Sequence, residues 1–283
     1  MTINKVSIIG AGTMGRGIAQ VSALAGYEVV LYDVAEPALV EAEAQIGRSI
    51  DKGVELGKTE TAVAEAAKSR LTTTTELTAA AQVDLVIEAA PEKLDLKRQI
   101  FGTLDEAAPA HTILSSNTSS LSISAIAGAT KRPQQVVGVH FFNPAHIMKL
   151  VEIIRGDLTA EATVQTVAAY VKQVGKTAVF CKDTPAFIVN RVARPFYGEA
   201  LRLLGEDAAD VETIDTLLKS LGFRMGPFEL IDLIGCDVNF AVTQSVYDAY
   251  FQEPKYRPHP IQRRMVESGR LGRKTGQGFY PYD

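Results

Sequence analysis

Short apolar runs alternate with longer helical stretches through the first half of the chain. An apolar run over residues 5–9 leads into an alanine-rich stretch that ends near Gly26, and a second apolar run covers residues 28–32. The region from Pro37 to Ser69 has the apolar spacing of helices. Further elements are expected as strands at Leu85–Ile87, Thr112–Ser115, Val136–Phe142, Lys149–Ile154 and Ala178–Cys181, and as a helix over Leu94–Glu106. Strands that alternate with helices predict an α/β fold with a doubly wound, mostly parallel sheet.

The pattern changes after Asp183. Thr184 followed by Pro185 is typical of a helix start. Helical periodicity then covers Ala186–Leu204, Ala209–Leu221 and Val238–Tyr250, with Gly205, Gly222 and Gly235 placed where helices can end. We therefore expect two domains: an α/β domain over residues 1–183 and a smaller, all-helical domain over residues 184–283.

A glycine-rich segment joins the first apolar run to the first helix. Gly10 permits a tight turn, Gly12 lets the backbone approach a pyrophosphate, and Gly15 lets the helix pack closely on the strand. Thr13 and Met14 open the helix, whose N-terminus attracts phosphate groups. A strand, this glycine pattern and a helix together predict a dinucleotide-binding βαβ unit.

Asp33 closes the second apolar run. A carboxylate at this place accepts hydrogen bonds from a ribose diol and repels a 2′-phosphate, so NAD is favoured over NADP. A chance glycine-rich turn with a surface aspartate would not require a second strand and an acid at this spacing. The first domain is therefore predicted to be Rossmann-like and to bind NAD.

Composition narrows the class of protein. The chain is 46% hydrophobic and 22% charged, with a net charge of −4, which is ordinary for a globular protein and argues against a nucleic-acid partner. Its two cysteines, Cys181 and Cys236, lie far apart, so no disulfide framework is expected and a reducing compartment is the default. No apolar run is long enough to cross a bilayer, and the first strand begins too early for a signal peptide. The sequence favours a cytoplasmic protein with neither a membrane nor nucleic acid as partner.

His140 and Glu152 form the first candidate pair for catalysis. His140 ends an apolar run at the sheet edge where open α/β sheets bind ligands. Glu152 interrupts a later apolar run, and a buried carboxylate needs a partner. If the turn at Asn143-Pro144 folds the second strand back, Glu152 can fix the imidazole tautomer and leave the other nitrogen as a base. Spacing alone equally allows a core histidine and a glutamate bonded to backbone.

Other polar residues carry less specific signals. Asn117 and Ser119 follow an expected strand, where they can bind a substrate oxygen or the nicotinamide, or where neighbouring hydroxyls can cap a helix. Asn190 is either a core amide or a contact to a cleft. Lys52 and Lys58 can meet the phosphates of a bulky substrate or simply cover a solvated helix face. The four histidines lack the clustered spacing of a metal site, so no metal is expected.

Several strings of the chain, taken in order, match one family. They are Gly10–Gly15 with Asp33, Ser116–Ser120, His140–Pro144 leading to Lys149–Glu152, Asp183–Arg191, Gly226–Leu230 and Gly272–Gly276. On these motifs the chain resembles the L-3-hydroxyacyl-CoA dehydrogenase family, in its bacterial 3-hydroxybutyryl-CoA dehydrogenase type. The resemblance implies an oxidoreductase that transfers a hydride between NAD and C3 of an L-3-hydroxyacyl-CoA. It also implies a homodimer formed through the helical domain.

The resemblance further implies a role for each matching residue. His140 is implied as the general base, oriented by Glu152. Ser119 is implied to bond the 3-oxygen of the substrate, and Asn190 to contact substrate from the helical domain. The implied contacts to NAD are Glu92, Lys97 and Asn117, and the implied contacts to coenzyme A are Lys52 and Lys58, where the match is loose.

Three alternatives compete with this prediction. A dehydrogenase of a free L-3-hydroxy acid or a sugar acid would use the same His–Glu pair without contacts to coenzyme A, so Lys52 and Lys58 discriminate between the two. The β-hydroxyacid dehydrogenase group places a lysine four residues before an asparagine, whereas Lys182 precedes Asn190 by eight. A non-catalytic NAD-binding protein is disfavoured because His140 and Glu152 are both present.

Overall fold

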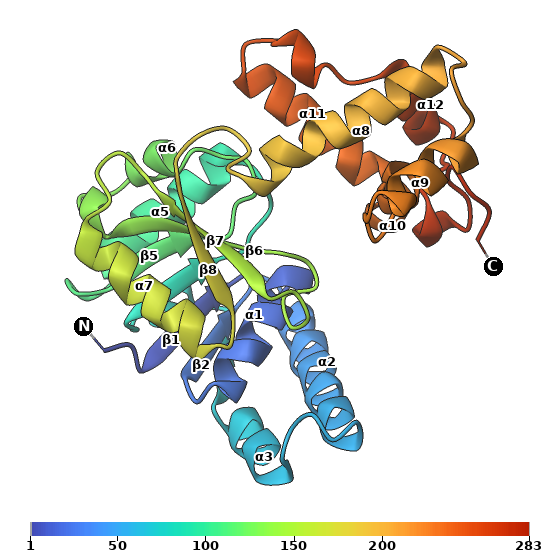
Figure 1. Ribbon diagram of the computed structural model, residues 1–283. Coiled ribbons are helices and arrows are strands. Elements are labelled where there is room, and N and C mark those ends of the chain that lie inside the picture. The colour runs from blue at the N-terminus through green and yellow to red at the C-terminus, as the bar shows by residue number, and fades with distance from the viewer. Residues whose placement is uncertain (1, 283) are drawn as a thin grey trace. The chain divides into compact units, whose positions relative to one another are not determined.

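The chain divides into two compact units in the computed structural model, which describes residues 2–282 (Figure 1). The units are Met1–Thr184 and Pro185–Asp283. This division lies one residue beyond the boundary expected after residue 183. The cofactor and substrate roles assigned to the two parts stay predictions.

One sheet organises the first unit. Its eight strands are β1 (Lys5–Ile9), β2 (Glu28–Tyr32), β3 (Leu71–Thr74), β4 (Leu85–Glu88), β5 (Ile113–Ser116), β6 (Val136–Phe141), β7 (Leu150–Arg155) and β8 (Thr177–Lys182). They lie in the order β3-β2-β1-β4-β5-β6-β7-β8. Every neighbouring pair is parallel except β6 and β7, which run antiparallel. The predicted doubly wound, mostly parallel sheet is confirmed.

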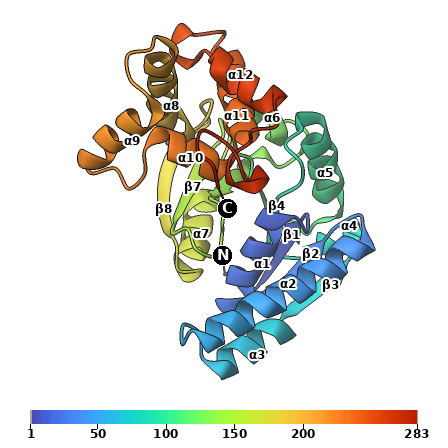
Figure 2. The same cartoon turned by 90° about the vertical axis from the view of Figure 1, so that its right-hand side faces the viewer.

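Helices cover both faces of this sheet (Figure 2). They are α1 (Thr13–Leu24), α2 (Glu36–Glu55), α3 (Thr61–Ser69), α4 (Leu77–Ala80), α5 (Leu94–Ala107), α6 (Ile123–Ala127) and α7 (Glu161–Gln173). Apolar side chains of α1, α2, α3 and α7 pack against one face of the strands in a single cluster. On the other face, α5 contacts both α4 and α6. The central strands β4, β5 and β6 are buried along their whole length, as is typical of a sheet covered on both faces.

The second unit is helical in its described part. Its helices are α8 (Val189–Gly205), α9 (Val211–Ser220), α10 (Pro227–Ile234), α11 (Cys236–Ala249) and α12 (Pro260–Glu267). They share a core of large apolar side chains that includes Leu201, Phe228 and Met265. The prediction of a smaller all-helical region after the sheet is confirmed.

The start of α8 differs from the expected helix. The sequence predicts a helix from Ala186, with Thr184 and Pro185 at its N-terminus, yet α8 begins at Val189. Ala186 and Phe187 have φ angles of 65° and 51° and are each 2% exposed. Left-handed backbone costs an L-residue about 1–2 kcal/mol, so the packing of these two buried side chains overrides the local helix signal.

The elements that were not predicted from the sequence include β3, α10 and α12. β3 is a four-residue strand at the sheet edge that holds three consecutive threonines. The helices α10 and α12 have eight residues each. Two turns of helix or four residues of strand contain too few apolar positions to establish a period.

The C-terminal segment is held by the carboxylate of Asp232. Its two oxygens accept hydrogen bonds from the backbone N–H groups of Phe279 and Tyr280 and from the hydroxyl of Tyr282, each at 3.0 Å. Gly278 lies so close that an added Cβ would meet the Asp232 carboxylate. The segment is therefore fixed by three groups that donate to one buried acid.

Replacing Asp232 by alanine should destabilise this unit. The three donors lose a charged acceptor, and an unpaired buried donor costs on the order of 1–3 kcal/mol. We expect the free energy of unfolding in urea to fall by about 3 kcal/mol. The exposed Asp248→Ala is the control and should change it by less than about 0.5 kcal/mol. Equal unfolding curves for the two variants would show that Asp232 does not hold the segment.

Candidate active site

The glycine-rich turn at the end of β1 has the close contacts that its sequence predicts. Gly10 has a φ of +111°, and a Cβ there would lie 2.8 Å from the carbonyl oxygen of Ala89. A Cβ on Gly15 would collide with the carbonyl of Gly10. A Cβ on Gly12 would have no atom within 4 Å, so the backbone of Gly12 is accessible to a ligand. Because α1 begins at Thr13, directly after this open position, the turn presents a helix N-terminus suited to phosphates.

Asp33 lies beside the same turn, at the end of β2. Its Oδ2 accepts a hydrogen bond from the N–H of Ala11 at 2.8 Å, and its Oδ1 accepts one from Ala35 at 3.1 Å. The carboxylate therefore ties the glycine turn to the start of α2. A cavity of about 720 Å³ opens here, lined by Gly10, Gly12, Thr13, Met14, Tyr32, Asp33 and apolar side chains of α5. This volume is large enough for a substantial part of a dinucleotide.

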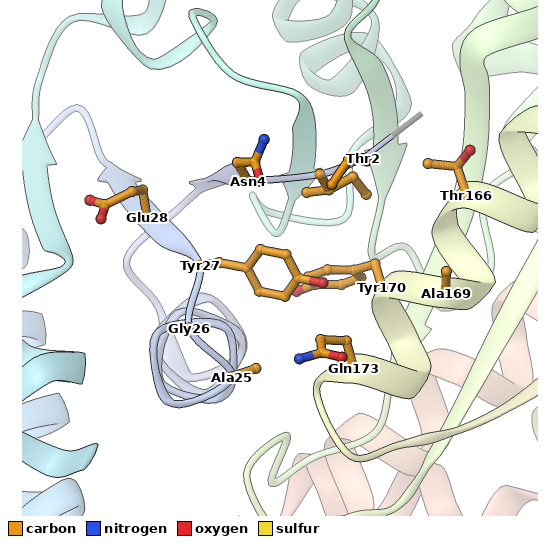
Figure 3. Close-up of a pocket in the computed structure, with 11 residues that line it drawn as sticks. Thr2, Asn4, Ala25, Gly26, Tyr27, Glu28, Thr166, Ala169, Tyr170 and Gln173 are labelled. Carbon is orange, nitrogen blue, oxygen red and sulfur yellow. The ribbon is translucent and has the colours of Figure 1, made fainter. Parts of the chain in front are cut away.

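A second hollow lies at the opposite edge of the sheet (Figure 3). Its volume is about 590 Å³, and it is lined by residues that precede β1 and β2 and by α7. The rings of Tyr27 and Tyr170 lie against each other there, with centroids 5.2 Å apart. The Tyr170 hydroxyl is already bonded to Ser22 at 2.7 Å. Since open α/β sheets bind ligands at the carboxyl ends of their strands, we place the candidate site at the glycine-turn edge instead.

His140 and Glu152 lie side by side on β6 and β7. The antiparallel return expected from the Asn143-Pro144 turn is present, and it pairs His140 directly with Glu152. The Nδ1 atom of His140 is 2.7 Å from Oε2 of Glu152. His140 is 6% exposed and Glu152 is fully buried. A buried carboxylate is thus satisfied by an imidazole at the carboxyl end of a parallel strand.

Asn117 connects this pair to the neighbouring strand. Its side-chain oxygen accepts a hydrogen bond from the N–H of Phe141 at 2.8 Å. Its own N–H donates to the carbonyl of Glu88 at 2.7 Å. Asn117 therefore joins the carboxyl ends of β4, β5 and β6 next to His140. Its implied contact to NAD stays a prediction.

The Glu92 carboxylate holds the loop that carries Ser119. Its Oε1 accepts hydrogen bonds from the Thr118 hydroxyl at 2.6 Å and from the N–H groups of Ser119 and Ser120 at 2.8 and 3.2 Å. The Ser119 hydroxyl also lies 3.3 Å from this oxygen. Burial alone would raise the pKa of Glu92, but the charge of Lys97 and these donors keep that pKa below its usual value. Glu92 is therefore a carboxylate at neutral pH.

Lys97 lies inside the protein rather than at its surface. Its side chain is 1% exposed, and its Nζ lies 2.6 Å from Glu88, 3.3 Å from Glu92 and 3.2 Å from the carbonyl oxygen of Ala90. The sequence singled out Lys97 and Glu92 only through resemblance. The structure adds that they belong to one ionic cluster with Glu88.

Two structural residues of the first unit were missed in the sequence. Glu88 extends β4 by one residue beyond the expected strand and is fully buried. Asp183 accepts hydrogen bonds from the Ser122 hydroxyl and from the N–H groups of Ile123 and Ser124, at 2.7, 3.0 and 2.7 Å. An acid directly after an apolar strand was the available signal for both. Ser122 is the N-cap of α6.

The remaining predicted residues belong to other elements. Asn190 lies in the first turn of α8 in the second unit, and its contact with substrate stays a prediction. Lys52 lies near the end of α2 and pairs with Glu55 at 2.8 Å. Lys58 lies just beyond α2, whose first turn follows Asp33. Since α2 has 20 residues and a helix rises ~1.5 Å per residue, the two lysines lie far from the glycine turn.

Residues 2–282 contain neither a metal-binding cluster nor a membrane-spanning helix. No group of three or more His, Cys, Asp or Glu side chains in this range is arranged to hold a metal ion. No helix in the same range has the length and apolar character required to cross a membrane.

Comparison with known proteins agrees with the sequence motifs. Residues 5–184 match the family model for the 3-hydroxyacyl-CoA dehydrogenase NAD binding domain, and residues 187–282 match the model for the C-terminal domain of the same family. The chain is 47% identical over its full length to 3-hydroxyadipyl-CoA dehydrogenase of Escherichia coli, but it spans only 60% of that protein.

Two further relatives match this chain along nearly their whole length. The probable 3-hydroxybutyryl-CoA dehydrogenase of Bacillus subtilis is 43% identical, and the alignment covers 100% of this chain and 99% of that protein. The crystal structure of (S)-3-hydroxybutyryl-CoA dehydrogenase from Ralstonia eutropha superposes with a TM-score of 0.95 at 41% identity, and all of both chains is covered. These matches confirm the resemblance seen in the sequence. The chain belongs to the 3-hydroxyacyl-CoA dehydrogenase family, and residues 5–184 form its NAD-binding domain.

Proposed function

We propose that this chain is an NAD-dependent dehydrogenase that interconverts an L-3-hydroxyacyl-CoA and the corresponding 3-oxoacyl-CoA. The observation that carries the proposal is the buried His140–Glu152 pair. It lies at the same sheet edge as the glycine turn and Asp33. A base and a dinucleotide site at one edge are what oxidation of a secondary alcohol requires.

His140 acts as the general base. The Glu152 carboxylate accepts from Nδ1–H, which leaves the lone pair on Nε2. Nε2 takes the proton of the 3-hydroxyl group during oxidation and returns it during reduction. When the imidazole becomes positively charged, the neighbouring carboxylate stabilises it. Glu152 thus both orients the base and lowers the cost of charging it.

Ser119 binds the 3-oxygen of the substrate. The backbone N–H groups of this loop donate to the Glu92 carboxylate and fix the loop. The Ser119 hydroxyl is therefore positioned before substrate arrives. A preformed donor stabilises the oxygen as charge develops on it. Asn190 is the proposed second contact to substrate, contributed by the helical unit.

The residues of the glycine-turn edge fit NAD. Gly12 leaves room for a pyrophosphate, α1 offers its N-terminus, and Asp33 is placed at the end of β2 where a ribose would lie. The nicotinamide ring, when bound, accepts or donates the hydride. Thr13 and Met14 line the same cavity. The loops around that site are held by Glu92, Lys97 and Asn117. The direct contacts of these residues with NAD that the resemblance implies are also part of this proposal.

The named relatives support a coenzyme A thioester as substrate. Their names give a 3-hydroxybutyryl chain in two cases and a 3-hydroxyadipyl chain in one. We propose 3-hydroxybutyryl-CoA and acetoacetyl-CoA as the substrate pair, with Lys52 and Lys58 as candidate contacts to coenzyme A. The alternative is a free L-3-hydroxy acid or a sugar acid.

The rate at which NADH absorbance is lost shows which of these substrates the enzyme uses. We expect turnover with acetoacetyl-CoA and a much lower kcat/KM with free acetoacetate at equal concentration, because binding of the coenzyme A part contributes to positioning. Turnover with acetoacetate alone would favour the free-acid alternative. A homodimer formed by the helical unit and a cytoplasmic location also belong to this proposal, and sedimentation at micromolar concentration tests the dimer.

Asp33 should make the enzyme select NADH over NADPH. Like charges brought together cost several kcal/mol, so we expect kcat/KM to favour NADH by ~10²-fold or more. Asp33→Asn should lower this preference by at least about tenfold, whereas Glu43→Gln on the exposed side of α2 should not change it. An unchanged preference in Asp33→Asn would remove Asp33 from cofactor selection.

A further inference from the structure

Glu88 is a buried carboxylate from which two hydrogen-bonded paths lead to the Ser119 loop. It is the last residue of β4 and is 0% exposed. Each of its side-chain oxygens has a different polar partner on another element. A buried charge requires such partners. Burial does not, however, require that both paths lead to the same loop.

The first path runs through two ionic contacts. Oε1 of Glu88 lies 2.6 Å from Nζ of Lys97 on α5. The same Nζ lies 3.3 Å from Oε2 of Glu92. The other oxygen of Glu92 accepts from the N–H of Ser119 at 2.8 Å and lies 3.3 Å from its hydroxyl. Lys97 therefore holds Glu92 in the position from which it binds the loop.

The second path runs along β5. The Ser116 hydroxyl donates to Oε2 of Glu88 at 2.6 Å. The Ser116 oxygen accepts from the N–H of Thr118 at 3.2 Å. The Thr118 hydroxyl in turn donates to Glu92 at 2.6 Å. The two paths meet at Glu92 and enclose the loop from both sides.

We propose that Glu88 is a positioning residue that fixes the Ser119 hydroxyl through Lys97 and Glu92 on one side and Ser116 and Thr118 on the other. This rests on the proposed function, in which Ser119 bonds the 3-oxygen of the substrate. Glu88 itself touches neither substrate nor the reacting atoms.

The charge of Glu88 matters because Lys97 is buried between two acids. Replacing Glu88 by glutamine leaves Lys97 with Glu92 as its remaining carboxylate. The ammonium then draws Glu92 toward itself, and the donors on Thr118, Ser119 and Ser120 lose their common acceptor. A displacement of about 1 Å of a positioning group can cost ~10²-fold in rate. The loop loses its fixed geometry while the glycine turn and Asp33 are untouched.

The test is a double-mutant cycle on kcat for acetoacetyl-CoA at saturating NADH. It compares wild type, Glu88→Gln, Ser119→Ala and the double variant. We expect Glu88→Gln to lower kcat by about tenfold or more in the wild-type background. In the Ser119→Ala background it should lower kcat by less than about threefold, because residues that act as a unit are not additive. Equal losses in the two backgrounds would overturn the proposal.

A matched control removes a different buried carboxylate that is also paired with a basic side chain. Asp105 on α5 pairs with Arg132 at 2.6 Å and is 6% exposed. Asp105→Asn should leave kcat unchanged. If Glu88→Gln does not fold because Lys97 keeps an incomplete set of partners, Glu88→Gln/Lys97→Met takes its place, since removing both charges is tolerated better than removing one. The same non-additivity with Ser119→Ala is expected of it.

Amide hydrogen exchange separates failure of this proposal from failure of the proposed function. Glu88→Gln should speed exchange at Ser119, Ser120 and Leu121, whose N–H groups donate to Glu92 and Thr118, and Asp105→Asn should not. Unchanged exchange at these amides would overturn the positioning role even if the enzyme reduces acetoacetyl-CoA. If exchange is faster in Glu88→Gln but the wild-type enzyme does not reduce acetoacetyl-CoA, the path from Glu88 to Ser119 is upheld and the proposed function is contradicted.

Discussion

Replacing His140 by alanine lowers kcat for acetoacetyl-CoA reduction by about 10²–10⁴-fold, the range that one positioned acid or base contributes. The imidazole is buried and hydrogen-bonded to Glu152 at 2.7 Å. Water from bulk solvent therefore cannot act as the base from the same position. The Kd for NADH, measured by fluorescence, should change by less than about threefold, because the glycine turn is intact. A loss in kcat with retained cofactor binding identifies a role in the chemical step.

His111 supplies the control for this variant. It is a largely exposed histidine that pairs with Asp84 at 3.1 Å, before the first residue of β5 and therefore at the opposite edge of the sheet. His111→Ala should have the wild-type kcat. A His140→Ala enzyme within about threefold of wild type would show that another group moves the proton.

Replacing Glu152 by glutamine should lower kcat by a similar factor, about 10²–10⁴-fold. Glutamine nearly matches glutamate in shape, but it can present an N–H to Nδ1 where the carboxylate only accepts. Nδ1 then accepts, Nε2 carries the hydrogen, and Nε2 cannot take a proton from the substrate. The neutral amide also removes the charge that stabilises the imidazolium. The measurement is kcat with acetoacetyl-CoA, together with thermal unfolding to verify that the variant is folded.

Glu161→Gln is the matched control for the second variant. Glu161 is an exposed acid paired with Arg155, so its replacement removes a carboxylate from the same unit without touching His140. We expect its rate to equal that of wild type. Equal rates for Glu152→Gln and wild type would reduce Glu152 to a packing role and remove the basis for assigning the tautomer.

The His140–Glu152 pair was within reach of sequence reasoning because strand geometry is regular. Once the turn at Asn143-Pro144 reverses the chain, antiparallel register places a residue opposite its partner. A charged residue inside an apolar strand then indicates which partner it needs. The glycine turn was predictable for a related reason, since Gly10 and Gly15 lie where a side chain would collide with neighbouring backbone.

The cluster around Glu92 was not predictable in this way. Its members come from β4, from the segment before α5, from α5 itself and from the loop after β5. Their meeting depends on how these elements pack, which no local period in the sequence records. The prediction that a helix starts at Ala186 was wrong for a related reason: Ala186 and Phe187 are buried and have left-handed backbone angles. Tertiary packing decided both cases.

The most direct measurement of the central claim follows the hydride itself. The enzyme is given acetoacetyl-CoA and NADH that carries deuterium at both C4 positions, and the product is analysed by mass spectrometry and NMR. We predict one deuterium at C3 of 3-hydroxybutyryl-CoA for each NADH consumed. Product without deuterium at C3, or no NADH consumed with the thioester while free acetoacetate is reduced, would contradict a hydride transfer between NAD and C3 of a 3-hydroxyacyl-CoA.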